Sequence, residues 1–319
     1  MTAPHQSRGK AAALAIFSVG VASTQDAIVK SVSGLYPAYE TVLIRTLTAA
    51  PLLLLWAGLT IGLSGFSSPL CRRAALRGLL LCTGYLGFIL AIAAMPIANG
   101  VAIYFTMPFF VAGLSGPFLK EHVPYYRWIA IAVAFAGIMV MSRLEAGAGI
   151  IPSLFALWSA LAYAIGQMMG RALSQKLEPL IITNIQNAMY GLVAVVLLLF
   201  VNATGIHLTG DKSLEFLTRS FVWPTAGDLA LLCLMGVLSS VAAVTFTMAY
   251  RAAEASFVAP FEYSAMIWAV SYGWLIFGDF PALPTWIGIS IVVLAGIYMA
   301  INDQRQKLRV TAPDNPPNP

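Results

Sequence analysis

The chain is dominated by apolar segments of about 20 residues, the length at which an α-helix crosses a hydrocarbon core of about 30 Å. Short stretches that carry most of the charged residues separate these segments. Only 10% of the 319 residues are charged and the mean hydropathy is +0.82, whereas a soluble domain carries about 25% charged residues. The chain therefore lacks the polar surface that a water-soluble globule needs. Membrane β-strands are excluded as well, because they alternate apolar and polar residues.

Ten such segments can be marked, and they predict an all-α polytopic membrane protein with ten transmembrane helices. The predicted spans are residues 11–31, 37–59, 76–95, 97–118, 125–142, 150–171, 180–201, 228–250, 255–277 and 282–301.

The distribution of basic residues predicts the orientation of these spans. If residues 1–10 lie in the cytoplasm, most Lys and Arg residues, Arg77 among them, fall in cytoplasmic segments, as the positive-inside rule requires. Residues 302–319 then return to the cytoplasm as a tail that is predicted to be disordered, because it is rich in proline and poor in apolar residues. We expect a bacterial inner-membrane protein with both termini inside. The first forty residues also fit a cleaved signal peptide, which is the alternative.

Two related halves are predicted, residues 11–142 and residues 149–301. A shift of 142 residues places Gln25 on Gln167, and a shift of 158 aligns the remaining spans, so that the extra residues of the second half fall within 203–227. Each half has an odd number of spans, so the second half enters the membrane from the opposite side. Inverted repeats are typical of secondary transporters, and a duplicated scaffold without transport is the alternative.

Several short motifs carry a family resemblance. They are Asp26-Ala27-Ile28-Val29-Lys30, Arg45, Met95-Pro96-Ile97-Ala98, Phe105-Thr106-Met107-Pro108, Leu119-Lys120-Glu121, the stretch 255–263 that ends in Phe261-Glu262-Tyr263, and Phe277-Gly278-Asp279-Phe280-Pro281. With these motifs the chain resembles the EamA-type family of the drug/metabolite transporter superfamily from about residue 10 to residue 301. The family usually has Glu where Asp279 stands, so the carboxylate is kept.

The resemblance implies alternating access around a central cavity that is lined mostly by helices 1, 3, 4, 6, 8 and 9, with helices 5 and 10 at the periphery. It also implies a small-molecule substrate. Our first expectation is uptake of a planar, vitamin-like molecule such as riboflavin, because the first two and the ninth helices resemble those of vitamin and S-adenosylmethionine permeases. The alternatives are an S-adenosylmethionine permease and an exporter of amino acids or drugs with the same fold.

Four charged residues lie within the first two spans, where an ionisable group needs a partner or a wet cavity. Counting residues from the outer face gives similar depths to Asp26 and Arg45, and to Lys30 and Glu40. We therefore predict two ion pairs, Asp26 with Arg45 and Lys30 with Glu40. Either these pairs only hold the helices together, or they act in transport: Arg45 or Lys30 attracts an anionic group, or Asp26 exchanges a proton.

Glu262 is predicted to bind substrate or a proton, because it lies about 10 Å inside the ninth span. A buried carboxyl with ordinary hydrogen-bond partners is the alternative. The other candidates for substrate binding are aromatic or amide side chains on the expected cavity helices, where a planar ligand can stack. They are Tyr85, Tyr104, Gln167, Tyr263 and Trp268.

Pro108 and Pro260 are predicted hinges, because proline removes a helical hydrogen bond; plain packing variation is the alternative. The pairs Gly58/Gly62 and Gly166/Gly170 match GxxxG, which favours close helix packing within the chain and otherwise a homodimer seam.

Other classes of protein are disfavoured. No GxxxxGK[ST] motif occurs, which argues against direct coupling to ATP. The three Cys and three His residues lack metal-ligand spacing, so no metal and no cofactor are expected. No HExxH or GxSxG motif supports an enzyme, and a channel would need a ring of similar polar residues. The expected partners are a small-molecule substrate, the lipid bilayer, a coupling proton and a second copy of the chain, but no nucleic acid.

Overall fold

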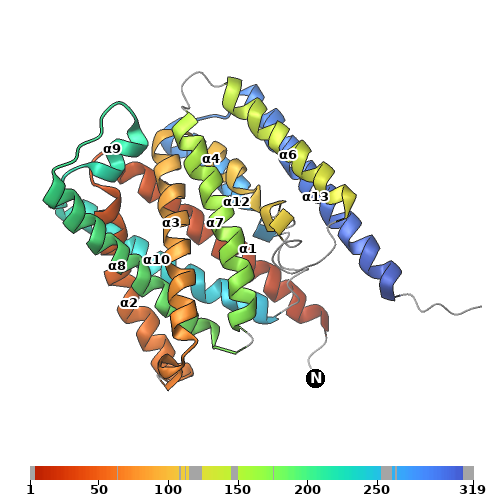
Figure 1. Ribbon diagram of the computed structural model, residues 1–319, viewed down its shortest axis with the longest axis horizontal. Helices are drawn as coiled ribbons and strands as arrows, with labels where there is room; N and C mark the ends of the chain where they lie inside the picture. Colours follow the sequence, from red (N-terminus) through yellow and green to blue (C-terminus); the bar gives the residue numbers. More distant parts are fainter. Residues whose placement is uncertain are drawn as a thin grey trace, which may run out of the picture.

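A computed structural model describes residues 4–62, 64–107, 109–111, 113–114, 124–144, 150–174, 176–252, 261–262 and 264–311. All regular elements in these residues are helices (Figure 1). They are α1 (Pro4–Val32), α2 (Ala38–Thr60), the short 3-10 helix η1 (Ser64–Ser67), α3 (Cys71–Ala94), α4 (Ile97–Tyr104), α6 (Tyr125–Leu144), α7 (Ile150–Ser174), α8 (Pro179–Thr204), α9 (Lys212–Thr218), α10 (Ala226–Ala252), α12 (Ser264–Phe277) and α13 (Leu283–Thr311).

Six of these helices are long and apolar enough to cross a membrane, which makes the chain a multi-pass membrane protein. They begin with residues 9–32 of α1 and include α2, α3, α8 and most of α7 and α10. Four shorter apolar helices accompany them. The predicted count of ten helices is not confirmed, because the described residues also form α9, which lies in the loop expected at residues 203–227.

Proline, glycine and aspartate set several helix ends. Pro37 and Pro96 immediately precede α2 and α4, and Pro179 occupies the first turn of α8, where its missing N–H costs nothing. Gly205 ends α8 with a left-handed φ of 62°. The Asp211 side chain caps α9 by accepting hydrogen bonds from the backbone N–H groups of Ser213 and Leu214. These residues therefore mark several helix starts and one helix end in the sequence.

The helices α1, α2, α3 and α6 of the first half correspond to α7, α8, α10 and α13 of the second half. When each helix is replaced by its counterpart, the packed pairs of helices stay the same. The pair α3 with α7 corresponds to α1 with α10, and α3 with α8 corresponds to α10 with α2. The pairs α2 with α8 and α6 with α13 correspond to themselves. Figure 1 shows α6 and α13 side by side along one flank, where the resemblance places helices 5 and 10.

The two GxxxG pairs behave differently. A Cβ at Gly166 would lie 2.5 Å from Cδ2 of Leu81, and a Cβ at Gly170 would lie 2.9 Å from Nε of Arg77, so this pair packs α7 closely on α3. Gly62, by contrast, lies beyond the end of α2 with a φ of +73°. The prediction of a helix-packing seam at Gly58 and Gly62 is therefore wrong, because the helix ends between them.

The segment around α9 is fastened to the ends of α1 and α2. Phe216 is fully buried, Arg219 Nη1 donates a hydrogen bond to the Ser33 carbonyl (2.9 Å), and Tyr39 donates to the Arg219 carbonyl (3.0 Å). The extra residues of the second half thus form an ordered cover over helices of the first half.

Candidate functional site

Arg45 lies at the centre of a cluster of aromatic and amide side chains. Its Nε donates a hydrogen bond to Oε1 of Gln25 (3.2 Å), and its guanidinium lies 4.7 Å from the ring centre of Tyr85 and 5.6 Å from that of Tyr190. The two tyrosine rings stack at 5.5 Å with an interplanar angle of 24°. An arginine over two rings combines a cation–π contact with a planar hydrogen-bonding surface.

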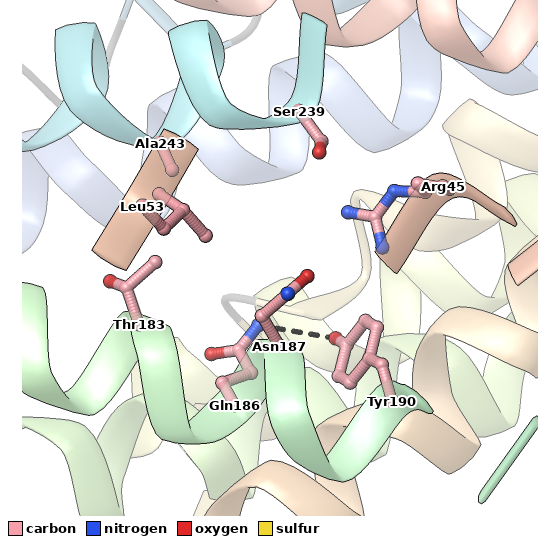
Figure 2. A pocket seen from close by; sticks show the side chains of 8 residues that line it. All are labelled: Arg45, Leu53, Thr183, Gln186, Asn187, Tyr190, Ser239 and Ala243. Atoms are coloured by element: carbon pink, nitrogen blue, oxygen red, sulfur yellow. Dashed lines mark hydrogen bonds between the residues drawn. The ribbon is translucent and has the colours of Figure 1, made fainter. Parts of the chain in front are cut away.

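A cavity of about 70 Å³ opens beside this guanidinium, between α2, α8 and α10 (Figure 2). Its lining residues are Arg45, Leu53, Thr183, Gln186, Asn187, Tyr190, Ser239 and Ala243. Nη1 of Arg45 is buried and has no hydrogen-bond partner among the residues that the structure describes. A buried donor without an acceptor costs free energy. We therefore expect a polar group of a ligand, or a water molecule, to accept a hydrogen bond from this atom.

Arg77 approaches the same cavity from α3. Its Nε donates to the Gly166 carbonyl (2.8 Å) and its Nη1 donates to Oε1 of Gln186 (2.9 Å). Gln186 in turn donates to the hydroxyl of Tyr190 (3.2 Å), as Figure 2 shows. Because arginine only donates hydrogen bonds, Arg77 fixes the orientation of the Gln186 amide.

The sequence interpretation missed this role of Arg77. It treated Arg77 as a marker of cytoplasmic loops because the third span was expected to begin at residue 76. The helix in fact begins at Cys71, so Arg77 lies well inside it. The available signal was Gly170, whose missing side chain leaves room for the Arg77 guanidinium.

The predicted ion pair between Lys30 and Glu40 is wrong. Lys30 Nζ instead lies 2.7 Å from Oδ2 of Asp279 and donates to the Met95 carbonyl (3.1 Å). Glu40 accepts a hydrogen bond from the backbone N–H of Val222 (3.3 Å). Depth counting matched the residues along the membrane normal, but it could not show that the Lys30 side chain points towards the loop after α12.

The predicted pair of Asp26 with Arg45 is not an ion pair either. Among the described residues, Lys30 and Asp279 form an ion pair, whereas no salt bridge joins Asp26 to Arg45. Arg45 acts on Asp26 through electrostatic attraction at longer range, while Gln25 is its hydrogen-bonded partner on α1. The residue next to the predicted one therefore makes the contact.

The remaining candidates divide into two groups. Tyr104 packs edge-on against Tyr163 (5.4 Å between ring centres), and Gln167 donates to the Tyr163 hydroxyl (3.2 Å). Glu262 lies within electrostatic range of both tyrosines. Trp268 stacks on Tyr272 (6.0 Å, 25°) against α1, where a Cβ at Gly20 would lie 3.0 Å from the indole. Tyr263 and the two expected hinges, Pro108 and Pro260, lie outside the described residues.

Exchanging the charges of Lys30 and Asp279 tests the ion pair. The single variant Asp279→Lys places two cations side by side, and we expect it to lower the midpoint of thermal unfolding by about 2–4 °C, the effect of about 1 kcal/mol. The Asp279 side chain is 36% exposed, so a larger effect is not expected. The double variant Lys30→Glu/Asp279→Lys should recover most of the loss. Equal midpoints for the single and double variants would show that the pair contributes nothing.

No group of three or more metal-ligating side chains occurs among the described residues. The polar atoms of the cluster are amides, phenols and guanidinium groups. They suit hydrogen bonding and stacking with an organic ligand better than they suit metal binding.

Comparisons with known proteins identify relatives of the chain. The sequence profile of the EamA-like transporter family matches residues 9–143 and again residues 150–301. A riboflavin transporter of Rhizobium johnstonii is 30% identical over 247 residues, which are 77% of this chain and 76% of that protein. An S-adenosylmethionine uptake transporter of Rickettsia bellii is 23% identical and covers 72% of each chain.

Two further matches cover more of the length. The pseudopaline exporter CntI of Pseudomonas aeruginosa is 26% identical over 90% of this chain and 94% of its own. A protein crystal structure with 16% sequence identity superposes with a TM-score of 0.62, covering 92% of this chain and 98% of that one. The fold therefore extends over nearly the whole sequence.

Proposed function

Because the chain belongs to the EamA-like transporter family, we propose that it is a secondary transporter that takes a planar, polar organic molecule into the cell across the bacterial inner membrane. Riboflavin is the first candidate substrate. Two riboflavin transporters, from Rhizobium johnstonii and Vibrio cholerae, are each 30% identical to this chain over most of its length. The proposal also needs a site for a planar ring, and the arginine–tyrosine cluster supplies one.

The stacked pair of Tyr85 and Tyr190 under the Arg45 guanidinium is the observation that carries the substrate class. Aromatic rings and a guanidinium plane present flat surfaces on which a conjugated ring system can stack. The unpartnered Nη1 of Arg45 adds a directed hydrogen-bond donor beside those surfaces. A flat ring that carries oxygen acceptors satisfies both features together.

The proposed architecture is ten transmembrane helices in two inverted halves, residues 11–142 and 149–301, with both termini in the cytoplasm. The two successive matches to the family profile support it, as does the exchange pattern of the helix pairs. Six long and four shorter apolar helices supply the required number of spans. Exchanging the conformations of two such halves opens a shared site to each side of the membrane in turn.

Uptake of S-adenosylmethionine is the second candidate. The opposite charges of Asp26 and Arg45 lie within electrostatic range of one another, which suits a ligand that carries both signs of charge. The relatives from Rickettsia species support this candidate, and the pseudopaline exporter supports export as a third.

Uptake by purified protein in liposomes tests the proposal. Vesicles that contain the protein should accumulate labelled riboflavin in a saturable manner, above vesicles of the same lipid without protein. Accumulation of S-adenosylmethionine with no riboflavin uptake would replace the first candidate by the second. No accumulation of either compound in vesicles that hold folded protein would contradict the proposal.

Proton coupling is proposed to depend on Glu262, because this carboxyl lies within electrostatic range of Tyr104 and Tyr163. Glu262→Gln keeps the shape and removes the titratable group, so we expect uptake to lose its dependence on outside pH between about 5 and 8. Glu215→Gln, a change in the α9 segment, is the matched control and should keep that dependence. An unchanged pH profile in Glu262→Gln would refute a coupling role.

Association into a homodimer stays a prediction, and it no longer rests on Gly58 and Gly62. Light scattering of the purified protein in detergent measures its mass. A protein mass near 34.1 kDa, that of one chain, would contradict it.

A further inference from the structure

Several side chains that line the cavity beside Arg45 already form hydrogen bonds within the protein. These bonds determine which donors and acceptors remain for a ligand. Thr183 donates its hydroxyl hydrogen to the Pro179 carbonyl (3.0 Å), and Ser239 donates to the Gly236 carbonyl (2.9 Å). A hydroxyl has one hydrogen to donate. Both oxygens can therefore only accept from a ligand.

Asn187 is oriented by a hydrogen bond to α2. Its Nδ2 donates to the Thr46 carbonyl (3.2 Å), and because a carbonyl only accepts, this contact fixes the orientation of the amide. Oδ1 of Asn187 is thus left as an acceptor, and Nδ2 keeps a second hydrogen that a ligand can use. Gln186 is held in place at both ends, since its Oε1 accepts from Arg77 and its Nε2 donates to Tyr190. Arg45 Nη1 is the buried donor of the cavity without a partner.

The donor and the main acceptor occupy equivalent positions of the two halves. The shift of 142 residues that places Gln25 on Gln167 also places Arg45 on Asn187. Their helices, α2 and α8, pack on each other and exchange with one another when the halves are exchanged. Figure 2 shows the Arg45 side chain at one edge of the cavity and the Asn187 side chain pointing into it from α8. The first half thus supplies the donor Arg45, and the equivalent position of the second half supplies the acceptor Asn187.

We propose that this cavity binds the edge of a substrate in which an oxygen acceptor lies next to an N–H donor, with the oxygen on Arg45 and the N–H directed to the acceptors of Asn187, Ser239 and Thr183. The inference rests on the proposed function and names the chemical group that its site recognises. The imide edge of a flavin ring and the α-amino acid group of S-adenosylmethionine share this chemistry. A phosphate or a dicarboxylate fits this set less well, because its oxygens would face the oxygens of Thr183 and Ser239, which have no hydrogen left to donate.

The volume limits the proposal to an edge of the ligand. A cavity of about 70 Å³ compares with roughly 30 Å³ for each water in the liquid. It holds the few atoms of an imide or amino acid group, while the rest of the ligand extends towards the stacked rings of Tyr85 and Tyr190 and needs the helices to part. The site is therefore a recognition point within a larger binding region.

Binding constants for paired ligands test the assignment in the purified full-length protein. Riboflavin is compared with 3-methylriboflavin, which lacks the imide N–H, and S-adenosylmethionine with its decarboxylated form, which lacks the oxygen acceptor. We expect the intact member of whichever pair binds to bind at least about tenfold more tightly, a difference of about 1.4 kcal/mol, because the other member leaves a buried polar group without a partner.

Variants of two asparagines separate the site from general stability. Asn187→Leu should reduce the preference for riboflavin over 3-methylriboflavin to within about twofold, and Arg45→Gln should do so for the S-adenosylmethionine pair. Asn184→Leu is the matched control, because Asn184 lies on the same helix and donates to the Leu53 and Leu180 carbonyls but does not line the cavity. It should keep the wild-type ratio even where it lowers the unfolding midpoint.

The outcomes distinguish the two proposals. Tight binding of S-adenosylmethionine alone, with preference over its decarboxylated form, would reject riboflavin as substrate and support the site. Riboflavin binding that ignores methylation, or a ratio that survives Asn187→Leu, would overturn the site and leave the proposed function standing. Absence of binding for all four compounds to folded protein would overturn both.

Discussion

Replacing Arg45 by lysine is expected to lower riboflavin uptake at least about tenfold, although the positive charge is kept. Lysine has no planar surface to lie over Tyr85 and Tyr190, and its compact ammonium cannot donate to Gln25 while also filling the place of Nη1. Loss of one charge-assisted hydrogen bond and of the stacked contact amounts to about 1.5–3 kcal/mol. Initial uptake rates in liposomes at subsaturating substrate measure this change.

Arg72→Lys is the control for this experiment, because Arg72 is an exposed arginine at the start of α3. It should transport as the wild type does. Wild-type uptake by Arg45→Lys would mean that the residue supplies charge alone, and that the stacked cluster is a packing feature.

Replacing Gly236 by alanine is expected to destabilise the protein by about 1–3 kcal/mol, the usual cost of forcing an extra carbon into a packed interface. A Cβ at this position would lie 2.5 Å from Cβ of Thr48 and 2.6 Å from the Arg45 carbonyl oxygen. Neither atom is the end of a flexible side chain, so α10 must move away from α2. That movement occurs in the turn that carries Arg45, and uptake should fall together with the unfolding midpoint.

Gly58→Ala is the matched change, since Gly58 lies in α2 with no heavy atom within 4 Å of an added Cβ. Alanine there should leave the midpoint unchanged or raise it slightly, because it favours the helix. If Gly236→Ala and Gly58→Ala have equal midpoints, the contact of α10 with α2 is looser than the distances indicate.

The helices could be predicted from the sequence because membrane spans depend on the length of apolar segments, which a linear pattern records. The starts of α2, α4 and α8 could be predicted as well, because each coincides with a proline, a residue that favours the first turn of a helix. The short helix α9 was not predicted. Its seven residues carry no span-length signal, and it is held by contacts to distant helices.

The candidate site could be predicted only in part. Arg45 stood out because a charge at membrane depth is unusual, and Tyr85 because the family resemblance places its helix at the cavity; the structure brings the two side chains together. Their partners, Gln25 and Tyr190, come from helices whose rotation a single sequence does not give. Arg77 was missed because its depth depends on where α3 begins, and Lys30 was given the wrong partner because Asp279 lies 249 positions away in the chain.

The fluorescence of riboflavin is the most direct measure of the central claim, that a planar ring binds against the tyrosines beside Arg45. Flavin emission is quenched when the ring stacks on an aromatic side chain, and titration of purified protein into riboflavin reports this contact without transport. The account predicts saturable quenching by the wild type and by Tyr85→Phe, which keeps the ring, and its loss in Tyr85→Leu. Equal quenching by Tyr85→Leu, or none by the folded wild type, would contradict it.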